Sequence, residues 1–341
     1  GVGFEPSLVI IKGDTSKQAV FRTTSMSGDN TFANFTTGTL TANLIESLDS
    51  DGFTIGTDAR VNSNGITYYY VAIRRETNDP DFNYGSYTGD GTDDRSITGV
   101  GFQPTLVVVK TNSNLGNYFD NNDNDSTGDH HFDAVTVNNQ IQALQSDGFQ
   151  IGSSNRVNSN GATYYWFAFR LVTGRIATGT YTGNATDDRN ITGIGFQPDW
   201  VWINNYQAGL SASDEAVFRT SSMSGDASLG FSQATAITTN LIQSLISNGF
   251  QIGTHNNVNI NNETYHWFAL QLTTTSTSTS TSTSTSTSTS TSTTSTSTST
   301  TSTSSSTSTS TSTTTTLTST STSTTSTSTS TSTSTSTSTS T

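Results

Sequence analysis

The stretch GVGFQPTLVVVK, residues 99–110, decides the fold of this chain, because the sequence contains it three times. The first copy is GVGFEPSLVIIK at residues 1–12, and the third is GIGFQPDWVWIN at residues 193–204. The copies begin 98 and 94 residues apart, so the repeat has the length of a small domain and not of a solenoid unit. Each copy joins a glycine-rich turn and a proline to a β-branched run of strand length. The sequence therefore predicts three similar β modules, here called modules 1, 2 and 3.

A second repeated segment lies at residues 43–56, 140–152 and 240–253. Each copy holds Asp-Gly or Asn-Gly between apolar residues, which is typical of a β-hairpin, because Gly and Asn accept the positive φ of a tight turn. The Leu-Ile part of each copy fits either a strand or one helical turn, since so few residues cannot decide the period.

A third repeated segment joins an Asn-rich turn to an aromatic strand, at residues 61–73, 157–169 and 258–270. Asn-Gly before such a strand again indicates a hairpin. The aromatic strands are apolar on both faces, which places them in the middle of a sandwich.

A fourth segment occurs only twice, as GSYTGDGTDDR at residues 85–95 and GTYTGNATDDR at residues 179–189. Three modules share two copies, so one module lacks a strand. It is module 1 if the segment leads its module, and module 3 if the segment trails. An unpaired sheet edge is a template for another chain.

No segment shows a sustained apolar period of 3.6 residues, so we expect an all-β protein. The predicted architecture is three tandem antiparallel β-sandwich modules, jelly-roll-like, followed by a low-complexity Ser/Thr tail. Module 1 spans residues 1–79 and is a candidate for the module that lacks one strand. Module 2 spans residues 80–173, module 3 spans residues 174–272, and the tail spans residues 273–341.

The succession of Phe-x-Pro, a β run, Gly-Phe-x-Ile-Gly and a closing aromatic strand resembles repeated modules of phage tail-fibre and prokaryotic cell-surface proteins. It is more faintly similar to the small sandwiches of H-type lectins. The resemblance covers residues 1–272 and consists of turns and core strands. It implies a β-sandwich fold and an extracellular setting, and it transfers no binding residues. Modules of this kind are mostly of unknown function.

All 13 basic and 26 acidic residues precede Thr273, so the net charge of −13 belongs to the three modules. With only three lysines, this surface lacks the basic footprint that nucleic acids and anionic membranes require, and we expect neither as a partner. No run approaches the roughly 18 apolar residues of a membrane span. The absence of cysteine excludes disulfides and thiolate metal sites.

Module 2 departs from its neighbours in an acidic loop that carries a candidate calcium site. Asp123, Asp125, Thr127 and Asp129 place oxygen atoms at alternate positions, as a calcium loop does. The twelfth position of that frame is Ala134, so the bidentate glutamate is missing. A solvated acidic loop is the simpler interpretation. Calcium is the one cofactor candidate, and none is required.

Other polar groups favour structural roles. The adjacent His130 and His131 would point to opposite faces of a strand, which disfavours a shared zinc ion. The Asp-Asp-Arg triplets at residues 93–95 and 187–189 recur with the scaffold and indicate a turn held by a local ion pair. The Phe-Arg-Thr segments at residues 21–29 and 218–226 carry hydroxyls and an Arg without a nucleophile–base pair. We therefore expect no enzyme activity and no catalytic residues.

The Ser/Thr tail cannot bury a core, and it is similar to the O-glycosylated mucin-like stalks of surface proteins. Candidate O-glycosylation sites begin at Thr273, Thr274, Thr275 and Ser276, and Asn-x-Ser/Thr sequons begin at Asn34, Asn124, Asn184, Asn190 and Asn262. We expect covalent glycans on the tail.

These features favour a non-enzymatic extracellular structural protein, a subunit of a glycosylated fibre or filament or of another surface appendage. We expect self-association into a polymer, with a tail segment or another end segment complementing the open edge of the next subunit. The alternative is a glycan-binding adhesin or phage tail-fibre receptor-binding protein that acts through the loop at residues 112–133. The expected location is extracellular or cell-surface, or on a virion fibre.

Overall fold

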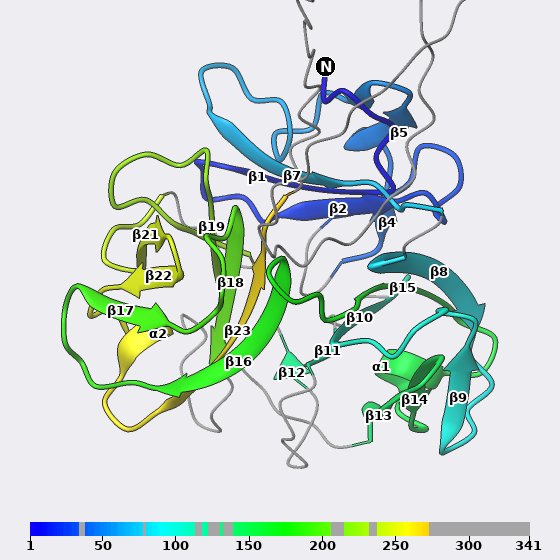
Figure 1. Cartoon of the computed structure of the whole chain (residues 1–341). Helices are drawn as coiled ribbons and strands as arrows, with labels where there is room; N and C mark the ends of the chain where they lie inside the picture. The colour runs from blue at the N-terminus through cyan, green and yellow to red at the C-terminus, as the bar shows by residue number, and fades with distance from the viewer. Residues whose placement is uncertain are drawn as a thin grey trace, which may run out of the picture. The chain divides into compact units, whose positions relative to one another are not determined.

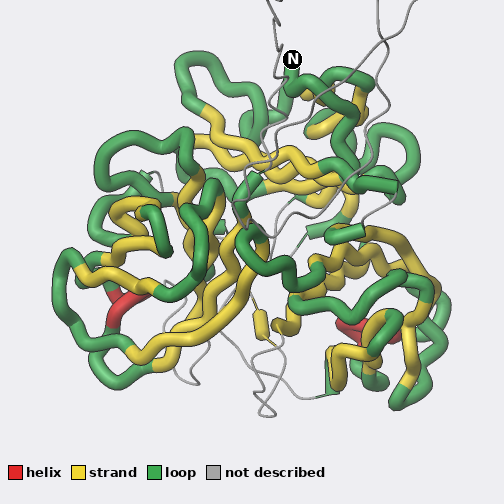
Figure 2. Tube along the Cα trace, viewed as in Figure 1, coloured by secondary structure: helices red, strands yellow, loops and turns green. Residues whose placement is uncertain are grey.

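The computed structural model describes residues 1–33, 38–77, 80–112, 118–121, 130–131, 139–205, 215–231 and 237–272. Figure 2 shows that strands make up nearly all the regular secondary structure of these residues, with two short helices beside the antiparallel sheets. The all-β fold predicted from the sequence is confirmed. Gly1–Thr277 form one compact unit and Ser278–Thr341 a second, and the Ser/Thr tail lies outside the described residues. The individual module boundaries stay a prediction.

Each module contributes its strands in the same order (Figure 1). Module 1 contains β1 (Leu8–Gly13), β2 (Val20–Thr23), β3 (Thr31–Phe32), β4 (Leu40–Thr41), β5 (Ile45–Asp49), β6 (Gly52–Ile55) and β7 (Tyr68–Ile73). Module 2 contains β8 (Phe82–Thr88), β9 (Arg95–Thr98), β10 (Leu106–Thr111), β11 (Tyr118–Asn121), β12 (His130–His131), β13 (Ile141–Gln145), β14 (Gly148–Ile151), α1 (Asn155–Asn158) and β15 (Thr163–Phe169). Module 3 contains β16 (Ile176–Thr182), β17 (Arg189–Thr192), β18 (Trp200–Asn205), β19 (Val217–Thr220), β20 (Leu229–Gly230), β21 (Ile242–Ile246), β22 (Gly249–Ile252), α2 (Asn256–Asn259) and β23 (Thr264–Leu270).

Every module pairs a large sheet with a small one. The large sheets run β4-β3-β2-β1-β7, β12-β11-β10-β15-β8 and β20-β19-β18-β23-β16, and the small sheets run β5-β6, β13-β14-β9 and β21-β22-β17. The repeated opening stretch forms β1, β10 and β18, and each of these strands pairs with the aromatic strand of its own module. The opening stretch is therefore an interior strand of each large sheet, and it is the middle strand in modules 2 and 3.

The segment that occurs twice leads its module. In module 2 its strand β8 pairs with β15 and its strand β9 pairs with β14. In module 3, β16 and β17 pair in the same way with β23 and β22. We call residues 82–98 and 176–192 the leading segments. In module 1 the corresponding sides of β7 and β6 pair with no further strand among the described residues.

Each large sheet has two buried faces, because its strands alternate between two cores. On β10, Val107 and Val109 pack into a core within module 2, between its two sheets. Leu106 and Val108, which alternate with them, belong to a cluster drawn from all three modules. We call this cluster the shared core. It explains why the aromatic strands are apolar on both faces.

The shared core is continuous across every pair of modules. The rings of Phe21 and Phe167 lie 5.7 Å apart and join modules 1 and 2. The rings of Phe169 and Phe268 lie 5.0 Å apart and join modules 2 and 3. Modules 1 and 3 meet where the Ala19 amide donates to the Phe231 carbonyl over 2.9 Å. The modules therefore form a closed set around one apolar centre.

The structure settles two of the local expectations. The Leu-Ile parts of the second repeated segment are the strands β5, β13 and β21, and the hairpin turns that follow them are confirmed. The hairpins expected at residues 61–65, 157–161 and 258–262 are wrong, because each of these segments leads from the small sheet to the large one. In modules 2 and 3 the connection begins with α1 and α2. Local turn chemistry does not reveal which sheet the next strand joins.

Candidate functional site

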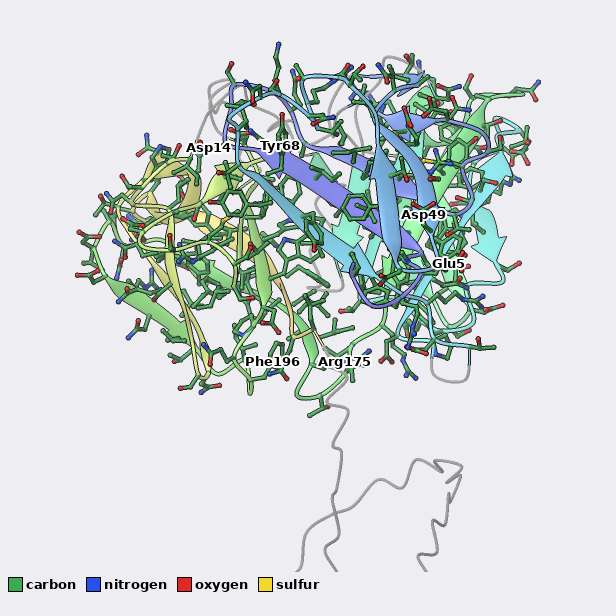
Figure 3. The ribbon with its side chains drawn as sticks, turned by 90° about the horizontal axis from the view of Figure 1, so that it is seen from above. Glu5, Asp14, Asp49, Tyr68, Arg175 and Phe196 are labelled. Atoms are coloured by element: carbon green, nitrogen blue, oxygen red, sulfur yellow. The ribbon has the colours of Figure 1, made fainter. Side chains whose placement is uncertain are left out.

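The unpaired edges of module 1 form the candidate site. Among the described residues, the outer sides of β7 and β6 pair with no other strand, and together we call them the open edge. Figure 3 looks onto module 1 and labels Tyr68 on β7 and Asp49 on the hairpin of β5 and β6. A free row of backbone N–H and C=O groups can pair with an added strand.

The open edge also exposes apolar side chains that are buried in the other modules. Tyr70 on β7 is 47% exposed, whereas Trp166 and Trp267 at the equivalent positions are 6% and 9% exposed. Ile55 on β6 is 36% exposed, whereas its counterparts on β14 and β22 are fully buried. Few large apolar side chains in the described part of the chain are this exposed, and two of them lie on the open edge. Such a patch indicates an interaction surface.

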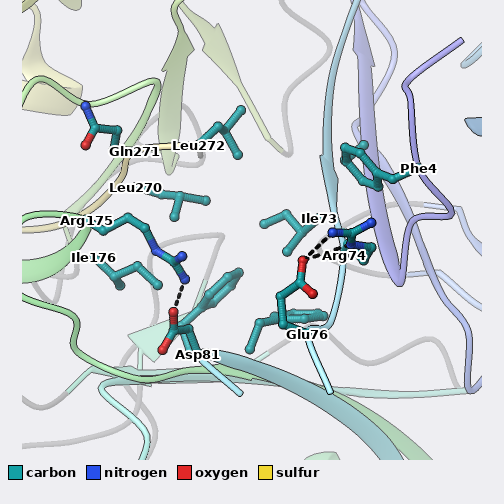
Figure 4. A pocket seen from close by; sticks show the side chains of 13 residues that line it. Phe4, Ile73, Arg74, Glu76, Asp81, Arg175, Ile176, Leu270, Gln271 and Leu272 are labelled. Carbon is teal, nitrogen blue, oxygen red and sulfur yellow. Dashed lines mark hydrogen bonds and ion pairs between the residues drawn. The ribbon is translucent and has the colours of Figure 1, made fainter. Parts of the chain in front are cut away.

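A second feature is a pocket of about 150 Å³ where the ends of β7, β15 and β23 meet (Figure 4). Asp81 lies in it with its carboxylate 5% exposed and accepts hydrogen bonds from Arg170, at 2.6 Å, and from Arg175. Arg175 immediately precedes β16, so the ion pairs tie the start of module 3 to the start of module 2. The ion pairs of Asp81 with Arg170 and Arg175 therefore have a structural role, because they hold module 3 to module 2.

We expect Asp81→Asn to destabilise the chain by about 2–3 kcal/mol, because it leaves two arginine charges uncompensated beside an apolar pocket. The effect stays below that of a fully buried pair because the arginines keep contact with water. Urea denaturation of the full chain measures it. The matched control is Glu76→Gln, which breaks the exposed ion pair with Arg74 in the same pocket and should cost less than about 1 kcal/mol. An equal loss of unfolding free energy in both variants would contradict a structural role for the ion pairs of Asp81.

The structure describes only some of the residues predicted to bind metal or carry glycans. Asp123, Asp125, Thr127 and Asp129 lie outside the described residues, as do Asn34, Asn124, Thr273, Thr274, Thr275 and Ser276. Asn184, Asn190 and Asn262 are exposed. The Thr186 hydroxyl donates to Asn184 Oδ1 over 2.7 Å. Within the described part of the chain, no three metal-binding side chains gather.

The Asp-Asp-Arg triplet of module 2 is a turn, as expected, but its ion pair is with a different acid. Asp94 has a φ of 56°, and Arg95 pairs with Asp90 at 3.3 Å between Nε and Oδ2. Arg95 also lies over the ring of Tyr87 at 5.5 Å, and Arg189 lies over Tyr181 at the same distance. The arginines of the two triplets therefore stabilise the leading segments through these contacts with Tyr87 and Tyr181.

Sequence reasoning missed the role of the repeated Phe-Arg-Thr segments. Arg219 is buried and donates to the carbonyls of Met223, Gly225, Ala227 and Ile242. Arg22 binds the equivalent loop of module 1 in the same way. The sequence does contain a signal for this role. An Arg that recurs beside a core Phe in two modules suggests a buried guanidinium that binds a loop.

Comparison with known proteins identifies one matching family, and the match covers module 2. Residues 77–175 match a family described as Domain of unknown function (DUF7483). This range begins before β8 and ends after β15, so it contains the leading segment together with the rest of module 2. No curated protein and no solved structure matches the chain. None of the helices in the described part of the chain is long and apolar enough to cross a membrane.

Proposed function

We propose that this chain is a non-enzymatic, extracellular structural protein, a glycosylated subunit of a fibre, filament or other surface appendage. Its subunits associate by strand complementation at module 1. The single observation that carries the proposal is the open edge, where Tyr70 and Ile55 are exposed while their counterparts in modules 2 and 3 are covered by a strand of their own module.

Strand addition suits a structural role for physical reasons. Backbone hydrogen bonds along the added strand supply affinity, and the alternating side chains supply specificity. A head-to-tail contact generates a linear polymer when the rotation between subunits does not close a ring, and we propose this open arrangement. The net charge of −13 opposes unspecific lateral association of such polymers.

The test is the mass and shape of the full chain as a function of concentration, by analytical ultracentrifugation and negative-stain electron microscopy. We expect linear polymers from the wild type and none from Tyr70→Lys, because a lysine on an edge strand opposes strand addition. The control is Leu171→Lys, which puts the same charge on an exposed apolar residue outside the open edge and should polymerise normally. Tyr70→Lys polymers of unchanged length would overturn the proposal.

The alternative is a glycan-binding adhesin or tail-fibre receptor-binding protein. It depends on the loop at residues 112–133, most of which lies outside the described residues. Saturable sugar binding by the full chain, abolished when that loop is replaced by its module 3 counterpart, would favour the alternative.

A further inference from the structure

We infer that module 1 can leave module 3 of its own chain and take the same place on a second copy, so that chains associate by exchanging module 1. The interaction surface is the interface between modules 1 and 3, and its partner is another copy of this chain. The inference goes beyond the proposed function, because it does not use the open edge. Three features of the closed set of modules carry it: how the chain ties each interface, where the chain can bend, and which interfaces bury charge.

The interface between modules 1 and 3 is held by contacts between residues far apart in the chain. The Ala19 amide donates to the Phe231 carbonyl over 2.9 Å. The Ile237 amide donates to Asp14 Oδ1 over 2.7 Å, across 223 positions of the sequence. The other two interfaces each join modules that are consecutive in the chain. The closed set can therefore open between modules 1 and 3 while the chain stays intact.

The connection between modules 2 and 3 holds these two modules together. It is a tight turn in which the Val172 amide donates to the Ile176 carbonyl over 3.1 Å, and the Ile176 amide donates to the Val172 carbonyl over 2.8 Å. Arg175 within this turn forms its ion pair with Asp81 at the start of module 2. A short turn with a buried ion pair leaves little freedom for rotation. Modules 2 and 3 therefore move as one body.

The connection between modules 1 and 2 is longer and more exposed. Residues 74–77 are exposed, and Arg74 and Glu76 form an ion pair within the connection itself. The Arg75 amide donates to Ser7 Oγ over 3.1 Å, which is a contact inside module 1. Residues 74–80 span about 23 Å when fully extended. This connection is therefore the hinge that lets module 1 separate from modules 2 and 3.

Both interfaces of module 1 bury a lysine. Burial lowers the pKa of Lys12 from 10.5 to about 8, and the nearby Glu215 of module 3, which is 4% exposed, raises it in part. Lys110 of module 2 lies 5.3 Å from the centre of the Phe32 ring of module 1. The equivalent residue of module 3 is the uncharged Asn204. Because burial of an ammonium group costs free energy that its contacts return only in part, separation of module 1 regains the hydration of both lysines.

A separated module 1 exposes apolar side chains that fit module 3 of another copy. Leu8, Ile10 and Phe21 of module 1 lie in the shared core, as do Phe218 and Phe231 of module 3. Exposure of such surfaces to water favours their association. Within one chain the effective concentration of the two surfaces is high, so the closed monomer is favoured in dilute solution. At high protein concentration the same contacts form between chains, which is domain exchange.

The test uses double-cysteine variants of the full chain, which has no cysteine of its own. Asp14→Cys/Ile237→Cys places two thiols on opposite sides of the interface between modules 1 and 3, at partly exposed positions, and a short bismaleimide joins them. Tyr70→Lys is added to oppose strand addition at the open edge. We expect crosslinked monomers from dilute protein on a denaturing gel. After long incubation at high concentration, we expect a ladder of crosslinked multimers.

The matched control is Thr105→Cys/Thr178→Cys in the same background. The two threonine hydroxyls lie 3.1 Å apart across the interface between modules 2 and 3. This variant should give crosslinked monomers only, at every concentration, because modules 2 and 3 stay together when module 1 exchanges. In both variants the crosslinked monomer also shows that the substituted chain keeps its closed form.

The outcomes separate the inference from the proposed function. Crosslinked monomers alone from Asp14→Cys/Ile237→Cys, at every concentration, overturn the inference. If the wild type then forms polymers that Tyr70→Lys abolishes, strand complementation at the open edge stands without module exchange. A ladder from Asp14→Cys/Ile237→Cys, with none from the control, sustains the inference even if the open edge has no role. Equal ladders from both variants would mean that module 3 also leaves module 2, and would overturn the exchange of module 1 alone.

Discussion

Phe169→Ala should destabilise all three modules together, by about 3–5 kcal/mol, in a single unfolding transition. Phe169 is almost fully buried in the shared core, where its ring contacts Phe82 at 4.9 Å and Phe268 of module 3 at 5.0 Å. Removing the ring leaves a cavity between modules that neighbouring strands cannot close without moving three sheets. Because the same core supports every large sheet, the loss is felt by the whole unit of residues 1–277.

Differential scanning calorimetry of the full chain measures this effect. The transition midpoint should fall while the ratio of calorimetric to van't Hoff enthalpy stays near that of the wild type. Leu171→Ala is the control, since this exposed leucine lies two residues further along and should change stability little. Separate transitions, of which only one shifts, would mean that the modules unfold independently and would contradict the shared core.

Lys110→Met should stabilise the protein near neutral pH and remove the contribution of Lys110 to a pH dependence of stability that the wild type shows. Lys110 is fully buried, and burial lowers its pKa from 10.5 to about 7, with a smaller contribution from Arg156. Its ammonium group lies 5.3 Å from the centre of the Phe32 ring and donates to the Thr111 carbonyl over 3.3 Å. These contacts do not offset the loss of hydration.

The sign follows from the two pKa values. Between about pH 7 and 10.5 the unfolded chain holds a proton on Lys110 that the folded chain has released, so raising the pH favours folding. The free energy of unfolding should rise by up to about 1.4 kcal/mol per pH unit in this window. Below about pH 7 both states are charged and the full penalty of burial remains. Lys12, with a pKa lowered mainly by burial to about 8, adds a similar slope that begins one unit higher.

Urea denaturation from pH 6 to 9.5 tests this prediction, with Lys17→Met as the control because Lys17 is exposed. In Lys110→Met, the remaining increase of unfolding free energy with pH should come from Lys12 alone. The gain in stability over the wild type should be largest near pH 6. Module 3 carries a buried asparagine, Asn204, at the equivalent position, so the fold accepts an uncharged residue there. A wild-type stability that falls from pH 7 to 9 would show that the ammonium group is not desolvated.

The sequence by itself determined the local structure of this protein. Three copies of the opening stretch located an interior strand of each large sheet, and the Asp-Gly or Asn-Gly of the second repeated segment located the hairpins of the small sheets. Strand period and turn chemistry are properties of neighbouring residues. The same information predicted three modules and the number of leading segments. It also predicted that the aromatic strands β7, β15 and β23, which are apolar on both faces, lie in the middle of a sandwich.

Only the tertiary structure decided what covers those faces and which modules the two leading segments join. Leu106 and Val107 are equally apolar, yet one lies in the shared core and the other in the core of module 2, and no local pattern separates the two. The leading strand β8 pairs with β15, across most of its module, so its place before or after a module could not be settled from neighbouring residues. The burial of Lys110 was equally beyond local patterns, since it depends on Phe32 of module 1, which is far away in the chain and lies beside it.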